Sequence, residues 1–221
     1  RILKMLTVHD GELMVEEKAI YTTEKFLVSR RLMYWQGYLH KTVLGAEKML
    51  VKIIQRAREL INAGEQLSSS VSTLDYFLQD TNAGAAVAYH LDKFCQLDDY
   101  DVLGAIKNWA SHSDKVLSTL CRGLIDRKLL KVKMQSEPFD ESYVRELKEE
   151  ISKALHLSDK ETDYLVFTGE ALNTTYDPSE ERINILFKDG TVKDISKVDN
   201  ALIQHNLARP VKKFYICHYR L

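Results

Sequence analysis

A stretch of helical sequence without proline, residues 22–63, constrains the fold of this chain more than any other feature. Thr22 and Thr23 are residues of the kind that cap helix N-termini, and Gly64 suits the position just after a helix. At about 1.5 Å per residue, an unbroken helix of this length spans roughly 60 Å. Because glycine weakens a helix, we expect any bend to fall at Gly37 or Gly45.

The predicted helix has two unlike faces. One is apolar at helical spacing and is the expected core stripe, formed by Val28, Leu32, Trp35, Leu39, Val43, Ala46, Leu50, Ile53, Ala57 and Ile61. The opposite face carries two cations and two phenols, because Arg30, Tyr34, Tyr38 and Lys41 fall at positions i, i+4, i+8 and i+11. These four residues occupy an arc of about 80°.

The chemistry of the second face suits a nucleotide. The planar guanidinium of Arg30 matches phosphate oxygens in pairs, and Lys41 supplies a point charge. A tyrosine ring can stack on a base or sugar while its hydroxyl group donates to an oxygen. The spacing alone is equally that of a solvent-exposed face packed on a neighbouring loop, so two interpretations stand at this point.

Composition excludes several classes of protein. The chain has 221 residues with 31 Lys and Arg against 32 Asp and Glu, so a globally basic nucleic-acid-binding protein is not indicated. Apolar runs fall short of the roughly 18 residues that a membrane span needs. The three cysteines are Cys95, Cys121 and Cys217; their wide spacing favours neither a disulfide framework nor a metal knuckle and suggests the cytoplasm.

The sequence predicts two domains that meet near residue 135. The segment 1–135 reads as mainly α, and the segment 136–221 reads as a smaller α+β domain. Beyond the long helix, we expect helices near 74–78, 98–110, 113–126 and 143–155. We expect strands near 6–8, 12–20, 129–134, 164–168, 183–187, 191–195 and 212–219, with a hairpin at Lys188-Asp189-Gly190.

Residues 24–42 resemble the helix that follows the metal motif in HD-domain phosphohydrolases. The most specific element is Tyr38-Leu39-His40-Lys41, which is similar to a Tyr-x-His-Lys element of that family. The opening Arg1-Ile2-Leu3-Lys4 and the segment 12–20 are similar in order and spacing. The nearest branch comprises the SAM- and HD-domain dNTP triphosphohydrolases and the bacterial dGTPase-like HD proteins.

The resemblance implies substrate-binding roles for five residues. Arg30 matches an arginine that contacts phosphates, and Tyr38 matches a tyrosine that packs against the sugar and base. Tyr34 stands where relatives carry His, so it can hydrogen-bond a phosphate but cannot act as an imidazole acid. His40 and Lys41 match the His-Lys pair, and His40 also suits a purely structural role.

The resemblance also implies a divalent metal, Mg, Mn, Fe or Zn, held by a His, a His-Asp pair and a later Asp. By the family pattern these ligands and the catalytic residues precede Arg1. His9-Asp10 is a poor substitute because Gly11 makes it a turn. We therefore expect no metal site within this chain and no activity from this chain alone.

The resulting hypothesis is the C-terminal portion of a cytoplasmic HD-type phosphohydrolase. In the family reaction, water attacks a phosphoryl group of a dNTP and releases nucleoside and triphosphate. The resemblance implies a homo-oligomer, and we expect neither membrane nor nucleic-acid partners. Two alternatives remain open: a nucleotide-binding regulatory module without catalysis, and an interaction scaffold that assembles through the tyrosine and arginine face.

Overall fold

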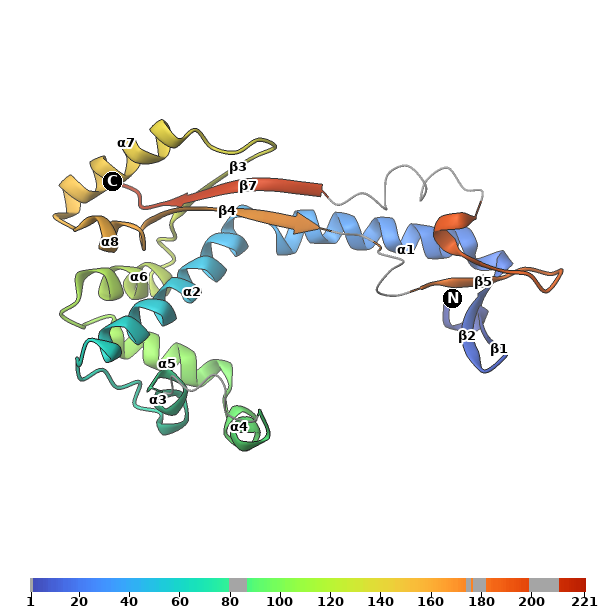
Figure 1. Ribbon diagram of the computed structural model, residues 1–221, viewed down its shortest axis with the longest axis horizontal. Coiled ribbons are helices and arrows are strands. Elements are labelled where there is room, and N and C mark those ends of the chain that lie inside the picture. Colours follow the sequence, from blue (N-terminus) through green and yellow to red (C-terminus); the bar gives the residue numbers. More distant parts are fainter. Residues whose placement is uncertain (1, 80–86, 174–175, 177–181, 199–210) are drawn as a thin grey trace. The chain divides into compact units, whose positions relative to one another are not determined.

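The computed structural model describes residues 2–79, 87–173, 176, 182–198 and 211–221 (Figure 1). The chain forms two compact units. The first comprises Arg1–His40 and Glu170–Phe214, and the second comprises Lys41–Gly169 and Tyr215–Leu221. This division differs from the predicted boundary near residue 135, because the chain leaves the first unit after His40 and later returns to it. A boundary that the chain crosses several times leaves no single shift in composition.

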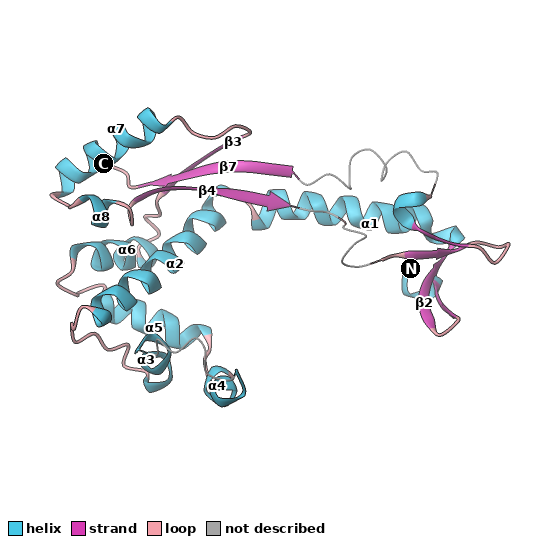
Figure 2. Ribbon diagram, viewed as in Figure 1, coloured by secondary structure: helices cyan, strands magenta, loops and turns pink. Residues whose placement is uncertain are grey.

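The first unit contains a four-stranded sheet in the order β1-β2-β5-β6. Strands β1 (Leu6–His9) and β2 (Glu12–Glu16) form an antiparallel hairpin, while β5 (Asn184–Leu186) runs parallel to β2. Strand β6 (Val192–Asp194) completes the sheet as the antiparallel partner of β5. Figure 2 distinguishes the strands from the helices by colour. The β5–β6 hairpin lies where the sequence predicts it, whereas the strand expected over residues 12–20 ends at Glu16 and is followed by helical turns.

Helix α1 (Ile20–Met33) begins in the core of this unit. Leu27 is 2% exposed and packs in one cluster with Ile185 and Ile195, both fully buried. The Thr23 hydroxyl donates to the carbonyl oxygen of Ala19 at 3.1 Å, so this buried hydroxyl has a hydrogen-bond partner. The first half of α1 is therefore anchored by apolar burial.

The predicted continuous helix 22–63 is wrong in one respect, because it breaks after residue 38. Helix α1 continues as a π-helical turn, Tyr34–Tyr38, and α2 begins separately as Lys41–Asn62. The Leu39 N–H donates to the Tyr34 carbonyl at 2.7 Å, an i→i+5 bond typical of a π turn. Gly37, one of the two positions where a bend is expected, lies inside this turn. Gly45 lies buried within α2 instead, where an added Cβ would be 3.1 Å from Val132 Cγ2.

Because of this break, the predicted core stripe includes residues that are exposed in the structure. Leu32 is 52% exposed and Val43 is 46% exposed, although both belong to the expected apolar face. Ile53 and Ala57 are fully buried as predicted. The buried residues of α2 are Leu44, Gly45, Met49, Ile53, Ala57 and Leu60. The π turn and the break change the helical period, so one wheel drawn through both helices misplaces residues on either side.

The second unit gathers helices around α2. Helix α2 packs against α3 (Ser72–Gln79) and α6 (Lys115–Ile125), and α6 also packs against α5 (Asp99–Trp109). Helix α4 (Val87–Phe94) lies between α3 and α5 in the sequence. Asp98 and Asp114 cap the N-termini of α5 and α6 through their carboxylates, as the sequence predicts. Among the described helices, none has both the length and the apolar character that a bilayer span requires.

A three-stranded sheet in the order β3-β7-β4 lies beside α7 (Glu141–Leu155), and the division between the units passes through β4 and β7 (Figure 1). Its strands are β3 (Lys131–Gln135), β7 (Val211–His218) and β4 (Val166–Asn173), and the short α8 (Asp159–Thr162) precedes β4. Gly169 is required here, since a Cβ would lie 2.4 Å from Tyr215 Oη. The predicted fold class, mainly α with a smaller α+β part, is confirmed.

Candidate functional site

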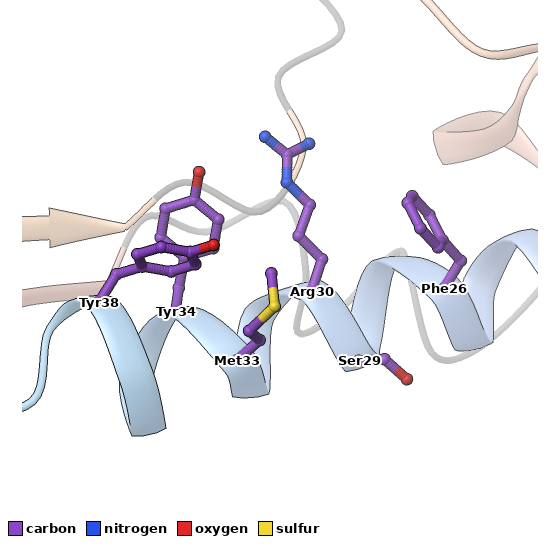
Figure 3. Close-up of a pocket in the computed structure, with 6 residues that line it drawn as sticks. All are labelled: Phe26, Ser29, Arg30, Met33, Tyr34 and Tyr38. Carbon is purple, nitrogen blue, oxygen red and sulfur yellow. The ribbon is translucent and has the colours of Figure 1, made fainter.

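Three of the predicted site residues line one pocket of about 340 Å³ in the first unit. Arg30 belongs to α1, whereas Tyr34 and Tyr38 belong to the π turn that continues it. Figure 3 shows their side chains rising from the same side of the helix. The complete lining is Phe26, Ser29, Arg30, Met33, Tyr34 and Tyr38.

The two tyrosines and the arginine contact one another. The ring centroids of Tyr34 and Tyr38 are 5.0 Å apart, and their planes make an angle of 47°. The Arg30 Cζ atom lies 5.7 Å from the Tyr34 ring centroid, which is a cation–π contact. Residues four apart lie nearly above one another on a helix, and this packing holds the three side chains on one face.

This face is open to solvent. Tyr38 is 56% exposed, and the apolar side chains of Phe26 and Met33 are 55% and 50% exposed. Exposed apolar side chains gathered beside a charged group are typical of a binding surface rather than of a neutral solvent face. The structure therefore shows one wall of a pocket, with a guanidinium that can pair with oxyanions and two phenols that can stack and donate hydrogen bonds.

The other two predicted residues are placed differently. Lys41 is the first residue of α2 and belongs to the second compact unit, so it is not part of this pocket. His40 is exposed between the π turn and α2, and its backbone N–H donates to the Gly37 carbonyl at 3.1 Å. His40 is also absent from the pocket lining. Helical spacing predicted a common face for Lys41 because it assumed an unbroken helix.

Sequence reasoning missed three lining residues, namely Phe26, Ser29 and Met33. A signal for Phe26 and Met33 was present, since they stand four residues before and three after Arg30 and so share its face. Searching for charged and phenolic groups passed over them. The π turn also makes a contact that the sequence did not predict: Lys213 Nζ lies 4.4 Å from the ring centroid of Trp35.

The described residues do not fit a metal site. In ranges 2–79, 87–173, 176, 182–198 and 211–221, no three His, Cys, Asp or Glu side chains come together as potential ligands. His9 and Asp10 form a pair, with Nε2 3.5 Å from Oδ2, at the tip of the β1–β2 hairpin. Asp10 has a positive φ of 52° there, in the turn that the Asp-Gly sequence predicts. Two ligands in an exposed turn do not enclose a catalytic ion.

The part of the chain that carries this pocket is similar to a known family of protein regions. Residues 1–77, which include α1 and the π turn, match the family model described as "HD associated region". An uncharacterized protein of Bacillus subtilis, YwfO, is 24% identical over 204 residues, covering 89% of this chain and 45% of that protein. The N-terminal third of the chain is thus similar to a region that is associated with HD domains.

Two solved structures are similar to this chain. The crystal structure of a phosphohydrolase from Bacteroides thetaiotaomicron has a TM-score of 0.88 and 42% sequence identity, covering 100% of this chain and 55% of that one. A hypothetical protein from Aquifex aeolicus has a TM-score of 0.60 at 20% identity and shares the fold, covering 99% of this chain and 47% of that one. The chain spans about half the length of these relatives.

Proposed function

We propose that this chain is part of an HD-type phosphohydrolase that acts on nucleotides, and that the whole protein hydrolyses deoxynucleoside triphosphates. The pocket on α1 and the π turn forms one wall of the substrate site. Arg30 binds phosphate oxygens, Tyr38 packs against the sugar and base, and Tyr34 donates a hydrogen bond to a phosphate oxygen. The observation that carries the proposal is the convergence of these three side chains on one pocket within the HD-associated region.

The state of Arg30 supports this assignment. In the described structure, the guanidinium of Arg30 contacts the Tyr34 ring, and no carboxylate pairs with it. An arginine without an acidic partner keeps its five donors available for an anionic ligand. The neighbouring phenols limit its movement on one side and provide flat surfaces on which a base can stack. These features suit a ligand that combines phosphates with an aromatic ring.

The proposal assigns different roles to this chain and to the rest of a longer protein. Relatives are about twice as long, and the similar protein of known class is a phosphohydrolase. Because the described residues do not gather three metal ligands, the proposal assigns the divalent metal and the catalytic groups to sequence outside this chain. The chain's own residues bind and orient the nucleotide. Cytoplasmic location and homo-oligomeric assembly belong to the same proposal.

The decisive experiment measures hydrolysis of the four dNTPs by the full-length protein, supplied in turn with Mg²⁺, Mn²⁺, Fe²⁺ and Zn²⁺, before and after Arg30→Gln. Hydrogen bonds to charged groups contribute about 1.5–3 kcal/mol, so kcat/KM is expected to fall by roughly ten- to a hundredfold. Lys25→Gln is the matched control, because Lys25 is an exposed cation on the same helix outside the pocket. It should leave kcat/KM within about twofold of the wild type.

Two results would count against the proposal. Absence of turnover with every dNTP and metal would remove the catalytic assignment. Nucleotide binding that nevertheless persists and disappears in Tyr38→Ala would instead identify a regulatory module. Equal kcat/KM values for the wild type and Arg30→Gln would exclude the assigned wall even if the protein is a phosphohydrolase.

A further inference from the structure

A second pocket, of about 430 Å³, lies in the second compact unit. It is formed where strands β3 and β7 meet helix α7. Its lining combines cations, a histidine and apolar groups: Lys131, Leu147, Glu150, Ile151, His218, Tyr219, Arg220 and Leu221. All of these residues belong to one unit, and none of them enters the function proposed above.

A buried imidazole is the central feature of this pocket. His218 is 8% exposed, and its Nδ1 lies 2.9 Å from the Tyr219 carbonyl oxygen. A carbonyl oxygen only accepts, so Nδ1 carries the proton, and in a neutral ring Nε2 is then a bare acceptor. Nε2 is buried without a hydrogen-bond partner. Buried polar atoms without a partner are rare in native proteins, and this one belongs to a residue that lines the pocket.

The electrostatic surroundings of His218 favour an anion. Burial lowers the pKa of His218, and the nearby charges of Lys133, Lys131 and Arg220 lower it further. Lys133 is engaged by the Tyr143 hydroxyl at 2.6 Å, whereas Lys131 and Arg220 have no ion pair within the described chain. Glu150 is the acidic residue in the lining. The cations therefore outnumber the acid around a neutral imidazole.

The remaining lining residues define the rest of the ligand. Ile151 is buried and Leu147 half-buried on α7, and the Tyr219 ring lies at the same pocket. An inorganic oxyanion alone would leave this apolar part of the lining unused. A pocket of about 430 Å³ is large enough for a small organic molecule.

We propose that this pocket binds a small organic phosphate monoester. Its phosphate lies between Lys131 and Arg220 and shares a proton with Nε2 of His218, and its apolar part lies against Leu147 and Ile151. Because Nε2 is buried, the proposed binding includes a movement of an exposed side chain at the pocket mouth. Lys131 and Arg220 are both exposed and long enough to move at little cost.

The sharing of a proton gives the proposal a distinctive pH dependence. Above about pH 7, both the phosphate dianion and the imidazole of the free partners lack the shared proton, since a phosphate monoester has its second pKa near 6. Binding then takes up one proton, so affinity should fall by up to about tenfold for each unit of pH rise. The other charged groups near the imidazole are Lys131, Lys133, Glu150 and Arg220.

The test uses phenyl phosphate, inorganic phosphate and neutral benzyl alcohol as probes with the purified full-length protein. Calorimetry should show saturable binding of phenyl phosphate, weaker binding of inorganic phosphate and none of benzyl alcohol. Lys131→Gln should weaken phenyl phosphate roughly tenfold or more. Lys153→Gln is the control, because Lys153 is an exposed cation of the same unit outside the pocket.

His218→Gln should keep some binding but lose the pH dependence between about pH 6 and pH 8. If that buried variant does not fold, the histidine ¹⁵N shifts of the wild type replace it, and Nε2 should change on addition of phenyl phosphate. Several results would overturn the proposal: no saturable binding, equal affinity for the two phosphates, or equal losses in Lys131→Gln and Lys153→Gln. The variants lie outside the α1 pocket, so this test and the dNTP test can fail independently.

Discussion

Helices α1 and α2 are neighbours in the sequence, yet their large apolar side chains differ in how far they are exposed to solvent. Along α2, Met49, Ile53 and Ala57 are at most 1% exposed, so its apolar face is fully used in packing. On α1 and the π turn, Phe26 and Tyr38 are each more than half exposed. Burial of large apolar groups stabilises a fold, whereas leaving them exposed is disfavoured unless something binds there. The contrast fits the proposal that α2 is a structural helix and α1 a binding helix.

The arginines of the two helices repeat this contrast. Arg56 on α2 donates from Nη2 to Asp114 Oδ2 at 2.6 Å and from Nε to Oδ1 at 3.2 Å. It also donates to Glu59 at 2.6 Å, and Glu59 accepts from the Tyr164 hydroxyl at 2.9 Å. Arg30 contacts an aromatic ring instead. The guanidinium of Arg56 therefore joins several elements, whereas the proposal assigns the donors of Arg30 to a ligand.

The largest effect that follows from this contrast is on stability. Ile53→Ala removes a fully buried side chain and should lower the free energy of unfolding by about 2–5 kcal/mol. Met33→Ala on α1 is its counterpart, and because Met33 is 50% exposed the loss should stay within about 0.5 kcal/mol. Urea unfolding followed by circular dichroism measures both. Comparable losses in the two variants would erase the distinction between the helices.

A smaller loss is expected at the ion pair of α2. Asp114→Asn keeps a capping side chain but removes the charge opposite Arg56, which still pairs with Glu59. Because a hydrogen bond to a charged group contributes about 1.5–3 kcal/mol, the free energy of unfolding should fall by about that amount. Arg30→Gln, which breaks no such pair, should change stability by less than about 0.5 kcal/mol. Thermal unfolding of the two variants gives the comparison. A stability loss in Arg30→Gln as large as that in Asp114→Asn would mean that Arg30 is structural.

The ion pair between Arg56 and Asp114 should also make the stability of the protein depend on pH. Burial raises the pKa of Asp114, but hydrogen bonds from Arg56 and from the Leu117 N–H outweigh it, so its pKa lies below the ordinary 3.8. A carboxyl with a depressed pKa in the folded state stabilises the protein above its unfolded pKa, and this contribution is lost as pH falls through the folded value. The stability difference between the wild type and Asp114→Asn should therefore be full above about pH 5 and shrink below about pH 4. A difference that does not vary with pH would contradict this assignment.

Local sequence signals predicted most of the secondary structure. Asp98 and Asp114 cap helices through their own carboxylates, and the turn at Lys188-Asp189-Gly190 joins β5 to β6 with Gly190 at a φ of 83°. Such signals act over a few residues, which is why a single sequence reveals them. The division into compact units depends on long-range contacts, and residue patterns alone did not indicate it.

The candidate site was predicted in part for a related reason. Arg30, Tyr34 and Tyr38 share a face because four-residue spacing survives in both the α-helix and the π turn. Lys41 lies beyond the break at Leu39 and His40, where helical spacing no longer applies. A π turn has no strong sequence signature, since it is a local change of hydrogen-bond partner. Helical spacing therefore predicted the shared face of Arg30, Tyr34 and Tyr38 but not the position of Lys41 after the break.

The central claim is that the open face of α1 and the π turn binds a nucleotide. A crystal structure of the full-length protein with a non-hydrolysable dNTP analogue tests it most directly. We predict phosphate oxygens within hydrogen-bond distance, about 2.7–3.2 Å, of the Arg30 guanidinium, and the sugar or base in contact with the Tyr38 ring. A nucleotide bound elsewhere, with Arg30 and Tyr38 still facing solvent, would contradict the account.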